Sequence, residues 1–139
     1  MLEEIGVGWQ IQAIRGATTV SQNLAEDIAT ATHELLDAIA SQNRLNPKHI
    51  ISVTFSVTQD LDALFPAAAA RQRTGWNAVP LLDVQHMHVV GSLPRCIRVL
   101  IHTQVPVLDE QVTHVYLREA KSLRPDLNER VVSVRSSCD

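Results

Sequence analysis

Four arginines stand where the sequence pattern predicts buried or half-buried elements. Their contexts are IQAIRGATTV for Arg15, FPAAAARQR for Arg71, RCIRVLIHT for Arg98 and KSLRPDL for Arg124. A buried arginine is very costly unless a partner compensates its charge. The planar guanidinium pairs with carboxylates through two parallel hydrogen bonds and keeps its proton at physiological pH. The four arginines therefore predict a local site for an anionic ligand.

The composition limits the other roles that this chain can have. Its 139 residues suit one domain, and its formal net charge of −3 leaves no overall basic field for nucleic acid. No run approaches the ~20 apolar residues that a membrane span needs. Glu3 and Glu4 stand where a signal peptide would carry positive charge. We expect a protein of the cytoplasm that binds neither nucleic acid nor membranes.

The cysteines and histidines do not form a metal-binding pattern. Cys96 lies in an apolar run and Cys138 lies next to the C-terminus, so the two predict no disulfide framework. His86 and His88 are close in sequence, but a zinc site needs about four ligands. We therefore expect no structural metal, and we expect Cys96 to be a small core residue.

In the first half of the chain, the patterns predict two strands and a long helix. QIQAIR at 10–15 alternates as a strand does, and Gly16 and the residues after it predict that the strand ends at Arg15. A helical apolar stripe follows from Asn23, which can cap the helix. The β-branched run at 50–58 predicts the second strand.

In the second half, short helices and strands alternate. The residues 60–62 predict a helix start, with Pro66 suited to a first turn. Two further strands are predicted at 79–84 and 96–105. Asp109 is expected to cap a final helix that carries Tyr116 and ends at 123–126. The last dozen residues are predicted to be a tail.

This order of elements favours an α+β fold, a mixed β-sheet with helices on one face. Such a sheet keeps an exposed apolar side or edge unless something covers it. Self-association is the usual solution in a small chain, so we expect a homo-oligomer.

Five segments taken together resemble the monofunctional, non-helical class of chorismate mutases, over residues 11–127. The segments are IRGATTV at 14–20, TQDLDALFPAAAAR at 58–71, GWNAVP at 75–80, CIRV at 96–99 and HVYLREAKSLRPDL at 114–127. The resemblance implies conversion of chorismate to prephenate without cofactor or metal, in phenylalanine and tyrosine biosynthesis. It also implies a homotrimeric pseudo-α/β-barrel with sites between subunits. Residues 1–10 would be an N-terminal extension and 128–139 a C-terminal tail.

The resemblance also implies roles for individual residues. Arg98 would face the ether oxygen of the substrate, and Arg15 would grip a substrate carboxylate. Tyr116 would add a hydrogen bond. The remaining substrate-binding residues would lie on the neighbouring face of the cleft or at its mouth: Phe65, Ala67, Arg71, Leu123 and Arg124.

Three positions depart from the family pattern. The family usually has a glutamate at His86, a cysteine at Asp83 and a lysine at Ala68. We hypothesise that Asp83 is a relocated acid that accepts from the substrate hydroxyl or pairs with Arg98, while His86 donates to Asp83 or to the substrate. Because alternate residues of a strand face opposite sides, this hypothesis requires a bulge or turn within DVQHM at 83–87.

Other interpretations stay open at this stage. Arg71 and Arg124 each end a predicted helix, where the helix dipole alone favours a cation. Asp83 alternatively serves only to neutralise Arg98. The chain as a whole is alternatively a non-catalytic binder of chorismate-like dicarboxylates, or a small trimeric deaminase of the reactive-imine type.

Overall fold

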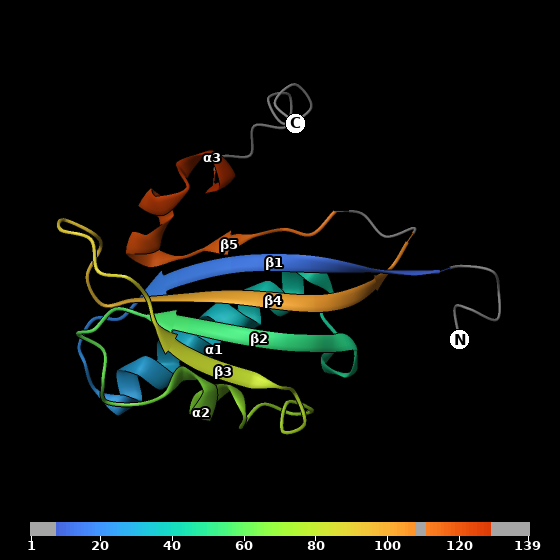
Figure 1. Ribbon diagram of the computed structural model, residues 1–139, viewed down its shortest axis with the longest axis horizontal. Helices are drawn as coiled ribbons and strands as arrows, with labels where there is room; N and C mark the ends of the chain where they lie inside the picture. The colour runs from blue at the N-terminus through green and yellow to red at the C-terminus, as the bar shows by residue number, and fades with distance from the viewer. Residues whose placement is uncertain (1–7, 108–110, 129–139) are drawn as a thin grey trace.

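A computed structural model describes residues 8–107 and 111–128, which form one five-stranded sheet (Figure 1). The strands are β1 (Trp9–Thr19), β2 (Ile50–Val57), β3 (Leu81–Gln85), β4 (Cys96–Pro106) and β5 (Val115–Tyr116), in the order β3-β2-β4-β1-β5. β4 runs antiparallel to both β1 and β2, whereas β3 is parallel to β2 and β5 is parallel to β1. The predicted mixed sheet is confirmed.

Two helices lie together on one face of the sheet, as the sequence predicted. The helix α1 (Ala25–Asn43) crosses behind the strands in Figure 1, and the short α2 (Pro66–Ala70) lies beside β3. Apolar side chains of α1 and of the strands make the core between them: Ile28, Leu35, Leu36, Ile39, Val53, Phe55, Ile97, Val99 and Ile101. On the sheet face opposite α1, a small second cluster buries Ala17, Tyr116 and Ala120. The chain continues through the 3-10 helices η2 (Pro47–His49) and η3 (Arg118–Leu123) and ends its described part with α3 (Pro125–Asn128).

The expectation that the first strand ends at Arg15 is wrong, because β1 continues to Thr19. Gly16 does not make a turn there but pairs with Val99 in the ladder. A Cβ on Gly16 would lie 2.9 Å from Ile39 Cδ1 and 3.0 Å from the Val115 carbonyl oxygen. The glycine is thus required for close packing of α1 and β5 against β1.

Two predicted helix starts are also wrong. The helix α1 begins at Ala25, and the side-chain oxygen of Asn23 accepts instead from the backbone N–H groups of Asp62 and Ala63. Asn23 therefore holds the loop at 61–63, and that loop is not helical. The next helix begins at Pro66, whose first-turn position is confirmed.

The helix expected to carry Tyr116 is a strand. Asp109, its expected cap, lies outside the described residues. Val115 packs into the main core, and Tyr116 packs on the opposite face against Ala17 and Ala120. Both side chains of the pair are buried because they point to opposite sides of β5.

Cys96 is buried, as expected for a small core residue. Within residues 8–107 and 111–128, no helix is long and apolar enough to cross a membrane. The expectations for residues 1–7 of the N-terminal extension and 129–139 of the tail lie outside the described residues.

Candidate functional site

Arg98 is at the centre of a row of residues that crosses the sheet on the face opposite α1. It pairs with Ser56 on β2 at one side and with Ala17 on β1 at the other, and Ala17 in turn pairs with Tyr116 on β5. Arg15 lies two residues before Ala17 and points to the same face. Three adjacent strands, β4, β1 and β5, thus bring Arg98, Arg15 and Tyr116 to one face.

The expected burial of the arginines is wrong for this protomer. Arg15, Arg71 and Arg98 are exposed, and Arg124 is half-buried. Strand alternation is the reason, because apolar neighbours such as Ile14, Ile97 and Val99 point into the core while Arg15 and Arg98 point away from it. In the described part of the chain, no carboxylate lies within ion-pair distance of Arg15 or Arg98. The two cations are therefore exposed, and no carboxylate of residues 8–107 and 111–128 serves as their counter-ion.

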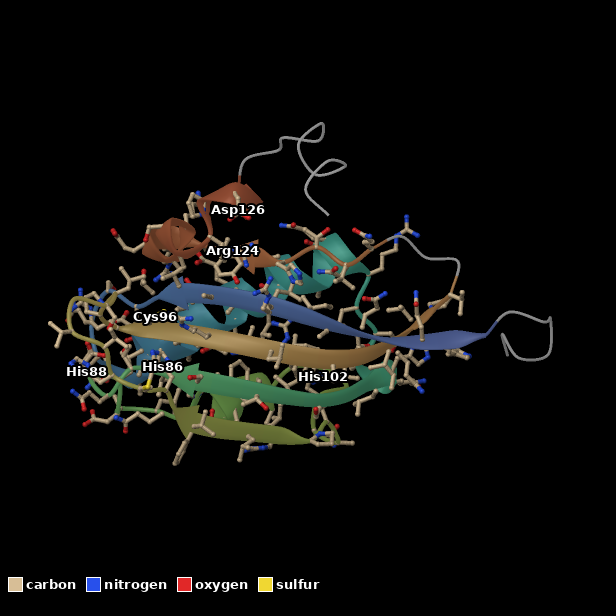
Figure 2. The ribbon with its side chains drawn as sticks, turned by 45° about the horizontal axis from the view of Figure 1, so that its top comes forward. His86, His88, Cys96, His102, Arg124 and Asp126 are labelled. Carbon is tan, nitrogen blue, oxygen red and sulfur yellow. The ribbon has the colours of Figure 1, made fainter. Side chains whose placement is uncertain are left out.

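A second group of polar side chains borders Arg15 at the edge of the sheet. The backbone N–H of Arg15 donates to His114 Nδ1 at 3.0 Å. Arg124 follows η3 and donates from Nε and Nη2 to the two carboxylate oxygens of Asp126, at 3.1 and 2.9 Å. Burial, together with Arg15 and Arg124, lowers the pKa of His114. Figure 2 shows Arg124 and Asp126 on the segment beyond β5.

His86 reaches the same face from the end of β3. Its N–H continues the ladder by donating to the Val57 carbonyl, and its ring Nδ1 lies 2.6 Å from Ser56 Oγ. Burial and the nearby Arg98 lower its pKa. His86 is therefore a neutral hydrogen-bonding group beside Arg98 at neutral pH.

The remaining expected residues form a different group, on α2 and the opposite side of β3. Asp83 Oδ1 accepts from the backbone N–H of Ala67 at 3.0 Å. Burial raises the pKa of Asp83, and the Ala67 hydrogen bond and the charge of Arg71 oppose this shift. Phe65, just before α2, is 69% exposed. One protomer therefore presents two separate sets of site residues.

The structure does not bring Asp83 and His86 together. β3 pairs with β2 from Leu81 to Gln85 without a register shift, so the required bulge is absent from that ladder. Asp83 is opposite Phe55, whose side chain is buried in the core, whereas His86 bonds Ser56 on the other face. Within one protomer, the expected hydrogen bond from His86 to Asp83 and the pairing of Asp83 with Arg98 are both wrong.

Sequence reasoning missed two residues of this site. Ser56 contacts His86, and His114 contacts Arg15. Ser56 had a usable signal, since it alternates with the apolar residues of IISVTFSV and must face away from the core. His114 begins the segment HVYLREAKSLRPDL on which the resemblance rests, but the expected helix placed it in the wrong element.

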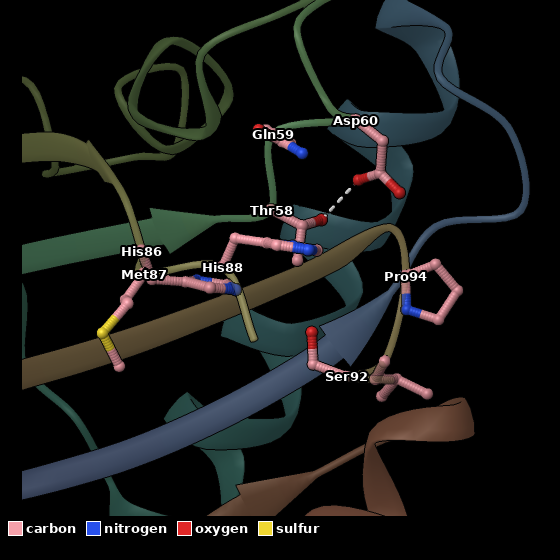
Figure 3. A pocket seen from close by; sticks show the side chains of 9 residues that line it. Thr58, Gln59, Asp60, His86, Met87, His88, Ser92 and Pro94 are labelled. Atoms are coloured by element: carbon pink, nitrogen blue, oxygen red, sulfur yellow. Dashed lines mark hydrogen bonds between the residues drawn. The ribbon is translucent and has the colours of Figure 1, made fainter. Parts of the chain in front are cut away.

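A cavity of about 130 Å³ lies next to His86 (Figure 3). His86, His88, Ser92 and Pro94 line it on the loop from β3 to β4, and Thr58 and Asp60 line it after β2. Asp60 accepts from the Thr58 hydroxyl and from the Arg95 N–H, so its carboxylate fixes these loops. Within the described residues, no group of three or more His, Cys, Asp or Glu side chains is arranged to hold a metal ion.

The arrangement suits recognition of a small anion with two carboxylates. Guanidinium groups on one face, a tyrosine hydroxyl and a neutral imidazole provide hydrogen-bond donors for such an anion. The family model of type I chorismate mutase matches residues 11–127. The chain belongs to the type I chorismate mutase family.

Individual relatives agree with the family model. Chorismate mutase AroH of Bacillus subtilis (strain 168) is 43% identical over 118 residues, covering 85% of this chain and 93% of that protein. Chorismate mutase AroH of Thermus thermophilus is 47% identical over 118 residues, which cover 84% of this chain and 96% of that protein. A solved structure, the chorismate mutase from Clostridium thermocellum, has a TM-score of 0.72 and 47% identity and covers 79% of this chain and 97% of that one. These matches favour a mutase over the deaminase interpretation.

Proposed function

We propose that this chorismate mutase converts chorismate to prephenate on the open face of the sheet, with Arg98 as the catalytic cation. The observation that carries this proposal is the row of Arg98, Ala17 and Tyr116 across adjacent strands, with Arg15 two residues away. Chorismate is a dianion, and its rearrangement breaks a carbon–oxygen bond while a carbon–carbon bond forms. No nucleophile or metal is needed for that single step.

The protein contributes to such a step through positioning and charge. Arg15 grips a carboxylate and holds the substrate in its compact reactive conformer. Arg98 faces the ether oxygen, where negative charge grows as the carbon–oxygen bond breaks. Tyr116 adds a hydrogen bond. Ser56 and the neutral His86 lie beside Arg98 and bind the ring hydroxyl in place of the family's glutamate.

We further propose that each complete site forms between two protomers of a homotrimer. One protomer provides the open face with Arg15, Arg98 and Tyr116, and its neighbour provides Phe65, Ala67, Arg71 and Asp83. Large apolar side chains on or beside these two sets support an interface: Ile11, Phe65, Leu82, Val84 and Leu100 are all exposed. Asp83 then reaches the substrate from the neighbour, which its position on the opposite side of β3 allows.

The residues that follow β5 lie at the mouth of the proposed site. Leu123 packs against Tyr116 and Ala120, and Arg124 follows it at the edge of the sheet. The family usually has a lysine at Ala68, and Arg71 and Arg124 together supply the positive charge that is missing there. We expect the enzyme to work in the cytoplasm, in phenylalanine and tyrosine biosynthesis.

The decisive experiment follows loss of the chorismate diene absorbance and confirms prephenate by acid conversion to phenylpyruvate. We expect saturable turnover that Arg98→Ala reduces by about 10²- to 10³-fold in kcat, the loss typical of removing one charge-stabilising donor. His33→Asn is the matched control, because His33 lies on α1 and takes no part in the site. Calorimetric binding of chorismate without turnover would instead identify a non-catalytic binder.

A further inference from the structure

His114 occupies an unusual place between the two elements that carry the site. The parallel pairing of β1 and β5 covers only Gly16 with Val115 and Ala17 with Tyr116, followed by the hydrogen bond from Leu117 N–H to the Ala17 carbonyl at 2.9 Å. Just before this short ladder, the Arg15 N–H donates to the His114 ring and not to a backbone carbonyl. An imidazole therefore extends the pairing of the two strands.

The neighbouring backbone explains why a side chain takes this position. The peptide groups of Thr113 are bound by Asn43 at the end of α1: Asn43 Nδ2 donates to the Thr113 carbonyl at 2.9 Å, and the Thr113 N–H donates to Asn43 Oδ1 at 2.7 Å. The Thr113 carbonyl is thus directed toward α1. The His114 ring, and not a backbone carbonyl, is therefore the acceptor that this segment offers to the Arg15 N–H.

The contact also defines which nitrogen of the His114 ring carries the proton. A nitrogen that accepts from an N–H carries no proton itself, so Nδ1 is unprotonated and the neutral ring holds its proton on Nε2. Protonation of Nδ1 would set two donors against each other and break the contact. It would also place a third cation between Arg15 and Arg124.

We propose that His114 is a positioning residue for the anion site: its neutral imidazole fixes Arg15 on β1 relative to Tyr116 and Arg124, and protonation of the ring releases this spacing. The inference rests on the proposed function, because chorismate is the ligand whose binding it controls. The expected consequence is a KM that rises in acid, while kcat, which depends on Arg98, changes less.

The charged groups around the His114 ring favour its neutral form. From β1 the charged group is Arg15, and from the end of η3 it is Arg124, which is bound by Asp126 on α3. The end of α1 contributes the neutral Asn43. Burial and the two arginines lower the pKa of His114, so the ring is neutral at pH 7 and titrates below its usual value of 6.5.

Two substitutions distinguish the hydrogen bond that His114 accepts from the protonation of its ring. His114→Asn places an amide oxygen where Nδ1 lies and does not titrate, whereas His114→Leu removes the acceptor. We expect His114→Leu to raise the KM for chorismate about five- to tenfold at pH 7.5, as for the loss of one hydrogen bond, with kcat within about threefold. His114→Asn should keep the wild-type KM within about threefold at pH 7.5 and show a smaller rise than the wild type between pH 7 and 5, because His86 still titrates.

Hydrogen exchange of the Arg15 amide provides a test without substrate. The amide should exchange about tenfold faster in His114→Leu than in the wild type, and His114→Asn should restore protection. His33→Leu is the control for loss of an imidazole elsewhere. Equal KM values in the wild type and His114→Leu, or an acid rise of KM in His114→Asn as large as in the wild type, would overturn the inference. If the wild type does not turn over chorismate while the exchange rates follow this order, the proposed function fails and the structural role of His114 stands.

Discussion

At the scale of single residues, the two proposed arginine roles separate kinetically. A carboxylate far from the breaking bond is bound almost equally in the ground and transition states, whereas the ether oxygen gains charge only in the transition state. We therefore expect Arg15→Ala to raise KM about tenfold and to leave kcat within a few-fold, while Arg98→Ala lowers kcat. Steady-state kinetics at saturating and limiting chorismate distinguishes these outcomes. A loss of kcat in Arg15→Ala equal to that in Arg98→Ala would contradict the assignment.

Histidine titration gives a second prediction at this scale. The pKa values of His86 and His114 are both lowered, chiefly by burial, and the neighbouring arginines lower them further. Below pH 6.5 the unfolded chain therefore binds more protons at these positions than the folded chain does. The free energy of unfolding must fall as the pH falls through 6.5 toward the lowered values.

Thermal melts at pH 7.5 and 5.5 measure this effect. We expect the wild type to lose more in Tm on acidification than the double variant His86→Gln/His114→Asn, which cannot protonate at either position. Asp83 has a raised pKa and acts in the opposite direction, but it is common to both proteins. Equal losses of Tm in the two proteins would show that neither ring is held neutral by the fold.

At the scale of elements, Gly16 tests whether close packing, and not a turn, requires glycine in β1. An added Cβ would lie 2.9 Å from Ile39 Cδ1, 3.0 Å from the Val115 carbonyl oxygen and 3.2 Å from Val99 Cγ1. Because the carbonyl belongs to the backbone of β5, relief requires movement of the strand. We expect Gly16→Ala to destabilise the protein by about 1–3 kcal/mol, measured by urea unfolding.

Gly8→Ala is the matched control for this prediction. A Cβ at Gly8 meets only Val107 Cγ2, at 3.7 Å, which is an ordinary contact. Its unfolding midpoint should stay close to that of the wild type. A Gly16→Ala variant as stable as Gly8→Ala would indicate that β5 moves away from β1 without cost.

The elements also show which parts of the fold could be predicted from the sequence. Strands β2, β3 and β4, the long helix and the first-turn position of Pro66 follow from local patterns, because apolar periodicity and proline geometry act within a few residues. The strand that carries Tyr116 could not be predicted from local patterns. Its two buried residues fit one face of a helix equally well, and only the long-range pairing with β1 makes it a strand. The same limit hid His114, which contacts Arg15 across 99 positions of sequence.

At the scale of the whole molecule, the site residues of one protomer fall into two sets. Arg15, Arg98 and Tyr116 share the open face, whereas Asp83 bonds α2 on the opposite side of β3. The resemblance already implied a neighbouring face for Phe65, Ala67 and Arg71, and the ladder of β3 adds Asp83 to that set and separates it from His86. The separation is expected if each complete site takes one set from each of two protomers.

Mixing two inactive variants tests this assembly. Arg98→Ala impairs the open face, and Arg71→Glu impairs the α2 side by reversing a charge, so each variant alone should have little activity. After unfolding and refolding of an equal mixture, a site between protomers should combine two intact sets in about a quarter of cases. Recovery of about a quarter of wild-type activity is therefore expected. If every site is built within one protomer, no mixed trimer contains an intact site, and the refolded mixture should be no more active than the two variants refolded separately.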